Sequence, residues 1–328
     1  MMTGVETMLY TNKLNENIFN THNYIECDEL IIISGYIGPS PIKRLSSLPI
    51  KTAIIYGLFS ADSNIDILHS SFLKLHKASS HKILYSKVPV NSNCYIWRKN
   101  KNITYALIGS ANFTTKGLNT PYRESLAEIT RDSFDELNDY LSQILSNSFA
   151  CDDSQLNFNY HKNRTHRDFP NISCKMALYK PSTEEVPTKS GLNWGNSPKG
   201  NTKPGDSYIP IRTSYIRNYP NLFPPKQSYP INANGGKQQR QNDPIELIWD
   251  DGVLMDALLE GSQPVDDILY PKQLCSFPHK NTLGHYIRKR LGLKETDLIK
   301  KSDLNNYGRC DVTLTVLQNG MYFADFSV

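Results

Sequence analysis

The first half of the chain alternates short apolar runs with segments of helical periodicity. The runs Leu30–Ile37 and Lys51–Gly57 are rich in isoleucine and lie beside glycines, as is typical of buried strands. From Asn64 to Ala78 apolar residues recur at helical spacing, and residues 133–146 show the same period after an acidic start. A further strand is expected over residues 124–129. This order of strands and helices predicts an α/β domain.

Residues 90–114, VNSNCYIWRKNKNITYALIGSANFT, predict a β-hairpin with a polar cluster at each end. The clusters are Asn91–Asn93 and Gly109–Asn112, and the ends of a hairpin meet, so we expect them to face each other. Hydroxyl, amide and backbone N–H groups beside a tight glycine can hold a phosphate oxygen without a metal ion. The GSANF turn alone is a weak signal, because many turns contain Gly, Ser and Asn for conformational reasons.

The second half has a different sequence pattern, in which short apolar segments, here called islands, are separated by Pro, Gly, Asn and Ser. This pattern predicts a mostly β second domain with one helix around Thr282–Gly292. The islands are residues 208–211, 245–249, 312–316 and 321–323. We expect a first domain over residues 1–160, a linker over 161–180 and a second domain over 181–328.

The net charge of +4 does not by itself require a polyanionic partner. The distribution of charge along the chain is therefore the better indicator of nucleic-acid binding. Residues 186–242 contain eight Lys or Arg and one acid, residues 243–267 contain eight acids and no Lys or Arg, and residues 272–309 contain nine basic and three acidic residues. Two basic segments could form a common face for nucleic acid. Ordinary solvated loops explain the same charges equally well.

Six cysteines lie far apart, without a C-x-x-C pair or a histidine at zinc-finger spacing, so we expect reduced thiols and no metal site. No apolar stretch approaches the roughly 20 residues of a membrane span, and the N-terminus does not resemble a signal peptide. These features predict a cytoplasmic protein without a membrane partner.

Several motifs together resemble the NgoFVII-type restriction endonucleases. In the first half they are SGYIGPSPIKRL, the hairpin with GSANFTTKGL, and YRESLAEI; in the second half they are GLNWG, SYIPI, WDDG, LGHYIRKRLGL, YGRCDV and YFADFS. The resemblance implies a bacterial protein with an α/β phospholipase-D-like nuclease domain, followed by a mostly β, B3-like pseudobarrel that binds DNA. It implies no cofactor.

The family carries His-x-Lys where this chain has Asn91-Ser92-Asn93. His81, Lys82 and Lys87 lie too far upstream to restore the motif. The resemblance places Asn91 at the nucleophile and Asn93 at the phosphate-binding lysine. Its other catalytic positions, Ser110, Asn112 and Glu124, are intact.

The family's chemistry implies that a neutral histidine attacks phosphorus and that water then releases the phosphohistidine. Since the chain holds one half-motif, a homodimer with the site on its two-fold axis is expected. An asparagine amide is neither a useful nucleophile nor a base near neutral pH, so we predict very slow cleavage. Either His and Lys of a parent enzyme were replaced on purpose, which the intact surroundings favour, or the chain is a natural pseudonuclease.

The resemblance also implies two loops, or arms, that grip the DNA major groove. The first arm offers Asn193, Trp194, Asn196, Lys199, Lys203 and Arg212, and the second offers Lys272, Ser276, His279, Lys280 and Asn281. These residue types suit base readout, although many such side chains contact only phosphate. Trp194 is expected to pack at the barrel mouth. Arg288 and Arg290 are expected on a solvated helix face or at a phosphate.

Three functions remain open. The first is a metal-independent type II-like restriction endonuclease acting on double-stranded DNA, with an altered nucleophile motif. The second is a catalytically silent, sequence-specific DNA-binding protein. The third is a lipid-directed phosphodiesterase, which the basic second half disfavours. Some relatives act with a separate helicase-like ATPase subunit; nothing in this chain resembles a P-loop, so ATP dependence would require that partner.

Overall fold

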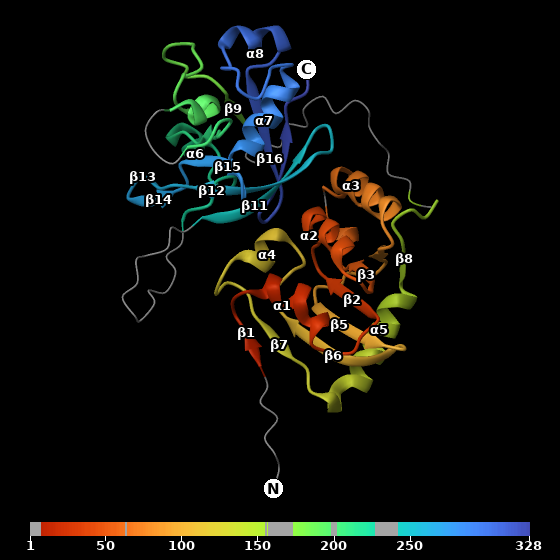
Figure 1. Ribbon diagram of the computed structural model, residues 1–328. Coiled ribbons are helices and arrows are strands. Elements are labelled where there is room, and N and C mark those ends of the chain that lie inside the picture. The colour runs from red at the N-terminus through yellow and green to blue at the C-terminus, as the bar shows by residue number, and fades with distance from the viewer. Residues whose placement is uncertain (1–7, 63, 155, 157–172, 198–201, 227–241) are drawn as a thin grey trace. The chain divides into compact units, whose positions relative to one another are not determined.

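The computed structural model describes residues 8–62, 64–154, 156, 173–197, 202–226 and 242–328 (Figure 1). The chain divides into two compact units, residues 1–164 and 165–328. Each unit is built around a sheet of its own.

The first unit contains an eight-stranded mixed sheet (Figure 1). β2, β3 and β4 run parallel, and the remaining neighbours are antiparallel. In spatial order the strands are β1 (Leu9–Tyr10), β7 (Leu126–Glu128), β6 (Asn102–Gly109), β5 (Asn93–Lys99), β2 (Glu29–Ser34), β3 (Lys51–Tyr56), β4 (Lys82–Ser86) and β8 (Ser148–Ala150).

Helices cover both faces of this sheet. On one face, Leu137 and Leu141 of α5 pack against a buried layer that includes Ile33 of β2. On the other face, Phe72 of α3 meets the ring of Tyr56 edge-on. The α-helices are α1 (Leu14–Asn20), α2 (Pro39–Arg44), α3 (Ile65–Ala78), α4 (Thr115–Asn119) and α5 (Phe134–Ser146), and the 3-10 helices are η1 (Thr21–Asn23), η2 (Leu45–Ser47), η3 (Phe59–Ala61) and η4 (Arg131–Ser133).

The long periodic segments of the first half are confirmed: α3 and α5 lie within a residue of their expected bounds. The strand expected over Leu30–Ile37 ends earlier, at Ser34. Beyond that point the chain leaves the ladder: the Gly35 N–H donates to the side chain of Asn93, and Ile37 pairs with Phe113 only as an isolated bridge. Short elements such as α1 and β1 were not predicted, because a few residues carry no measurable period.

The second unit contains a seven-stranded sheet in which only β11 and β17 are parallel neighbours (Figure 1). In spatial order its strands are β10 (Ile209–Pro210), β15 (Gln273–Ser276), β12 (Leu254–Glu260), β11 (Asp243–Trp249), β17 (Met321–Asp325), β16 (Asp311–Gln318) and β9 (Ser173–Ala177). A separate ribbon joins β13 (Gln263–Val265) and β14 (Ile268–Tyr270). The helices are η5 (Gly191–Asn196), α6 (Thr213–Asn218), α7 (Asn281–Arg290) and α8 (Lys301–Tyr307).

The mostly β character of this unit and its helix near Thr282–Gly292 are confirmed, the helix as α7. One expectation differs. Residues 161–180 were expected to form a linker, but β9 lies within them and pairs with β16 as an edge strand of the sheet. In β9 the side chains of Cys174 and Met176 are buried and alternate with more exposed ones. This alternation covers only five residues, so the sequence alone did not indicate a strand after the polar residues that precede it.

His81 joins three segments of the first unit and is a structural residue. Its side chain is buried, Nδ1 contacts the hydroxyl of Thr52 on β3, and Nε2 contacts the hydroxyl of Ser46 in η2 at 2.9 Å. Burial lowers the pKa of His81. This histidine is therefore held neutral within the fold and is not a substitute nucleophile.

We expect His81 to make the first unit less stable in mild acid. Its pKa is lower in the folded than in the unfolded chain. The contribution of neutral His81 to the free energy of unfolding is therefore fully present above the unfolded pKa of about 6.5, and it falls as the pH drops below that value. His81→Gln should reduce this slope of the unfolding free energy, by at most about 1.4 kcal/mol per pH unit. Chemical denaturation between pH 7.5 and 5 measures it. His279→Gln, at an exposed position, is the control, and an unchanged slope in His81→Gln would contradict the assignment.

Candidate active site and DNA-binding surface

The hairpin brings the two polar clusters together. In the β5–β6 register Asn93 lies directly opposite Gly109, so the start of β5 meets the end of β6. The end of β2 lies beside them, because β2 pairs with β5 from the other side. Three strand ends thus surround one small polar region at an edge of the sheet.

The hydroxyl of Ser34, the last residue of β2, is at the centre of this region. Ser34 is fully buried, and its Oγ accepts the backbone N–H of Phe113 at 2.9 Å. The same oxygen lies 2.8 Å from Oδ1 of Asn93 and 2.7 Å from the carbonyl oxygen of Tyr36. One hydroxyl therefore links the end of β2 to the start of β5 and to the loop after β6.

Asn93 uses both ends of its amide within the fold. Oδ1 accepts the hydroxyl of Ser34 and the N–H of Gly35, at 2.8 and 3.1 Å. Nδ2 donates to the carbonyl oxygens of Ser110 and Gly109, at 3.1 and 3.4 Å. The side chain is only 4% exposed. Asn93 is thus a satisfied structural group and has no donor left for a phosphate.

The side-chain amides of Asn91 and Asn112 both approach Gly35 where a Cβ atom would lie. A Cβ atom built on Gly35 would be 2.6 Å from Oδ1 of Asn91 and 3.2 Å from Oδ1 of Asn112. Asn112 is anchored by the N–H of Tyr36, which donates to Oδ1 at 2.8 Å. Asn91 is exposed. The close approach explains the glycine at position 35 and leaves the two amides side by side.

Ser110 and Glu124 lie on adjoining loops that are bonded to each other. The Ser110 N–H donates to the carbonyl oxygen of Ser125 at 3.0 Å, and the Ser125 N–H donates to Ser110 Oγ at 3.1 Å. Gly109 permits this contact, since a Cβ there would be 2.0 Å from that carbonyl oxygen. Burial raises the pKa of Tyr95, and the charges of Cys94 and Glu124 raise it further. Glu124 directly precedes Ser125 in the chain, so its backbone lies beside Ser110.

The five predicted positions, Asn91, Asn93, Ser110, Asn112 and Glu124, thus meet at one end of the sheet. The amides of Asn91 and Asn112 and the exposed hydroxyl of Ser110 are polar groups that can hold the oxygens of an anion. In the part of the chain that the structure describes, no three His, Cys, Asp or Glu side chains are grouped as a metal site would require. Sequence reasoning assigned no role to Ser34 and Gly35, because both lie inside the strand expected over Leu30–Ile37, whereas the observed strand ends at Ser34.

The predicted DNA-binding residues of the second unit divide into groups. Trp194, Lys272 and Lys280 line one cavity of about 430 Å³. Asn196, Lys203 and His279 are exposed, Asn281 is half-buried, and Lys199 lies outside the described residues. The ammonium of Lys280 lies 5.0 Å from the ring centre of Trp194, so this contact joins the two predicted arms.

Two of the predicted contacts are buried inside the unit. Asn193 is fully buried; its Nδ2 donates to the carbonyl oxygens of Pro187 and Ile299, and its Oδ1 accepts from Ile299 and Arg288. Ser276 is 1% exposed and accepts the N–H of Leu283 at 2.9 Å. Because both side chains are buried, neither is accessible to a base in this structure. The local sequence of the arms does not reveal this burial.

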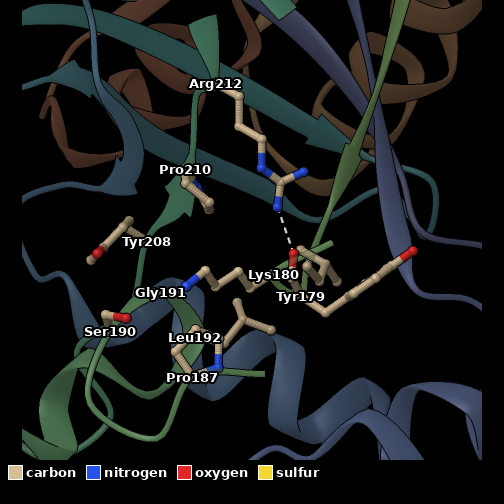
Figure 2. A pocket seen from close by; sticks show the side chains of 10 residues that line it. Tyr179, Lys180, Pro187, Ser190, Gly191, Leu192, Tyr208, Pro210 and Arg212 are labelled. Carbon is tan, nitrogen blue, oxygen red and sulfur yellow. Dashed lines mark hydrogen bonds between the residues drawn. The ribbon is translucent and has the colours of Figure 1, made fainter. Parts of the chain in front are cut away.

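The arginines also have internal partners. Arg212 donates to the carbonyl oxygen of Tyr179 at 2.5 Å and to the hydroxyl of Tyr215, and it lines a separate cavity of about 200 Å³ (Figure 2). Arg288 is buried and donates to carbonyl oxygens. Arg290 pairs with Asp250 at 2.9 Å. The expectation of a solvated face or a phosphate contact at Arg288 and Arg290 is therefore wrong, since both hold the unit together.

The site and the two sheets define a two-domain protein with a phospholipase-D-like first domain and a B3-like second domain. Residues 12–157 match the NgoFVII restriction endonuclease N-terminal PLD domain, and residues 146–318 match the NgoFVII C-terminal B3-like DNA-binding domain. The chain belongs to the NgoFVII restriction endonuclease family. Both parts of the predicted fold are thereby confirmed.

A comparison with curated proteins gave no match. Among solved structures, the chain is similar to NucT from Helicobacter pylori, with 16% identity over 44% of this chain and 98% of NucT and a TM-score of 0.34. It is also similar to Nuc, a phospholipase D family member from Salmonella typhimurium, with 9% identity over 44% of this chain and 98% of Nuc and a TM-score of 0.32. In the described residues no helix is long and apolar enough to cross a membrane.

We expect Ser34→Ala to loosen the polar region. The substitution leaves the buried N–H of Phe113 without its acceptor, which should cost about 1–3 kcal/mol of unfolding free energy. Hydrogen exchange of the Phe113 amide should accelerate correspondingly, because local opening exposes it. Ser142→Ala, on the exposed face of α5, is the matched control and should change stability by no more than about 0.5 kcal/mol. Unchanged exchange at Phe113 would contradict the central role of Ser34.

Proposed function

We propose that this chain recognises a specific double-stranded DNA sequence as a type II-like restriction endonuclease subunit whose phosphodiester hydrolysis is disabled. Asn93 carries this proposal: it stands at the family's lysine position, is buried, and uses its amide entirely within the fold. Asn91, at the histidine position, is exposed beside Asn112. The remaining positions of the motif are present.

In the active form that the family implies, a neutral histidine at position 91 attacks phosphorus while the P–O bond to the leaving strand breaks. A histidine of a second subunit protonates the leaving oxygen. Water then attacks phosphorus, the P–N bond breaks, and the histidine is released. Glu124 orients the nucleophile, and the lysine, Ser110 and Asn112 hold the nonbridging oxygens without a metal ion. Double-stranded DNA and a second copy of the chain are the partners, and ATP dependence would require a separate helicase-like subunit.

Asparagine changes this chemistry at both positions. The amide nitrogen of Asn91 has its lone pair delocalised into the carbonyl, so it neither attacks phosphorus nor accepts a proton near neutral pH. Asn93 replaces a cation by a neutral group, so the charge that would stabilise the transition state is absent. Loss of the nucleophile alone typically lowers the rate by several orders of magnitude.

One contact favours a natural pseudonuclease over deliberate replacement. Oδ1 of Asn93 accepts hydrogen bonds from Ser34 and from the N–H of Gly35, and a lysine has no acceptor with which to replace it. A lysine here would leave a buried N–H to find another partner. The strand ends around position 93 are therefore suited to the asparagine that occupies it.

We expect restoration of the motif to separate these alternatives. The double variant Asn91→His, Asn93→Lys should cleave DNA in EDTA and form a covalent DNA–protein adduct that survives denaturation, if the chain descends directly from an active enzyme. Adding Ser110→Ala should reduce that cleavage roughly 100-fold or more by removing a phosphate contact. Circular dichroism checks folding. A folded double variant without cleavage or adduct, on DNA that it binds, would count heavily against the nuclease assignment and leave a sequence-specific DNA-binding protein.

Binding to DNA should depend strongly on salt through the exposed lysines of the arms. Lys203→Ala and Lys272→Ala should each weaken binding to all sequences and lower the slope of log Kd against log salt by about 1. Lys175→Ala, exposed on the opposite edge strand β9, is the matched control. Fluorescence anisotropy at several salt concentrations measures the slope. Equal slopes in all variants would argue against these arms as the DNA-binding surface.

A further inference from the structure

Among the described residues that line the cavity where the two predicted arms meet, one carries a carboxylate. Glu260, the last residue of β12, lines this cavity together with Trp194, Lys226, Lys272 and Lys280. Its side chain is 10% exposed. An acid inside a basic concavity is unexpected on a surface that binds a polyanion, so Glu260 requires an explanation.

The donors around Glu260 converge on one of its two oxygens. Oε2 accepts Nζ of Lys280 at 2.6 Å, the thiol of Cys275 at 3.0 Å and Nε2 of Gln273 at 3.2 Å. Among the described residues no side chain or backbone donor bonds to Oε1, and Oε1 is not one of their buried atoms without a partner. With respect to the described residues, Oε1 therefore keeps its lone pairs for a donor that enters the cavity.

The carboxylate is ionised at neutral pH. Burial alone would raise the pKa of Glu260, but the hydrogen bonds from Lys280 and Cys275 and the charge of Lys280 bring it below its ordinary value. An ionised carboxylate only accepts hydrogen bonds. The cavity thus presents a fixed acceptor that bonds donors and repels acceptors.

Lys280 has a different role from the one that its residue type suggests. Its ammonium is held between Glu260, at 2.6 Å, and the ring of Trp194, at 5.0 Å. A lysine committed to these contacts cannot reach freely for guanine O6 and N7. It fixes the position of Glu260 across the junction of the arms, while Lys272 and Lys226 supply positive charge at the cavity.

In the major groove the four bases differ in the groups that they present to such an acceptor. Cytosine and adenine present an exocyclic amino group, which donates, whereas guanine and thymine present carbonyl oxygens, which accept. A carboxylate at a fixed position therefore favours an amino base and opposes a keto base.

We propose that Glu260 is a specificity-determining residue, whose Oε1 accepts a hydrogen bond from the exocyclic amine of a cytosine or adenine in the recognition sequence. This rests on the proposed DNA binding by the second unit. The target sequence then contains one position restricted to amino bases on the contacted strand. Keto bases are excluded there by the repulsion between carbonyl and carboxylate oxygens.

Selection from a random duplex library, with the full chain and with Glu260→Gln, tests the proposal. A Gln side chain has nearly the same shape but offers both a donor and an acceptor. The unaltered chain should select only cytosine or adenine at one position, and Glu260→Gln should accept guanine or thymine there as well. Glu184→Gln, an exposed change of the same charge in the same unit, is the control and should select the unaltered sequence.

A second measurement uses the unaltered chain, so that it does not depend on how the variant folds. Within the selected duplex, the base at the restricted position is replaced by its analogue without the amine, pyrimidin-2-one for cytosine or purine for adenine. Binding should weaken about 10-fold or more. The base that responds identifies cytosine or adenine as the contact.

The two proposals fail in different ways. Specific binding with the same preference in Glu260→Gln, or with no loss on removal of the amine, would overturn the role of Glu260 and leave sequence-specific binding intact. Binding by the unaltered chain without any sequence preference would overturn the proposed function, and the role of Glu260 with it.

Discussion

The hydroxyl of Ser34 holds the polar end of the first domain together. A buried hydroxyl must find partners, and this one binds the N–H of Phe113 and contacts Asn93. These contacts tie the end of β2 to the start of β5 and to the loop after β6. The adjoining Gly35 leaves room for Asn91 and Asn112 only because it has no side chain. The site is therefore built on strand ends, whose positions the sheet controls.

Asn93 places a neutral amide where the family carries a lysine. The family's lysine would bring a cation to the phosphate, whereas the amide of Asn93 is consumed by Ser34, Gly35 and two carbonyl oxygens. Under the proposed function, the attraction for DNA comes mainly from the second domain, where the basic segments of the sequence lie.

The second domain shows why the charge of a residue does not define its role. Arg288 and Arg290 lie in a basic segment, yet both act inside the domain, one on carbonyl oxygens and one on Asp250. Lys280 is paired with an acid from the acidic segment of the sequence. Pairing between segments that are distant in sequence decides which charges are used inside the domain, and in the described residues the bonds to Glu260 all go to Oε2.

The sequence by itself determined the two-domain organisation, the α/β character of the first domain, the mostly β character of the second, and the hairpin that brings Asn91–Asn93 to Gly109–Asn112. Long periodic segments and ordered motifs carry this information locally. Only the tertiary structure decided that Asn93, Asn193 and Ser276 are buried, that Ser34 links three strand ends, and that Glu260 faces the cavity between the arms. The reason is physical: burial and hydrogen-bond partners depend on residues far away in the chain, and a polar side chain reads the same in sequence whether it meets solvent or a buried carbonyl oxygen.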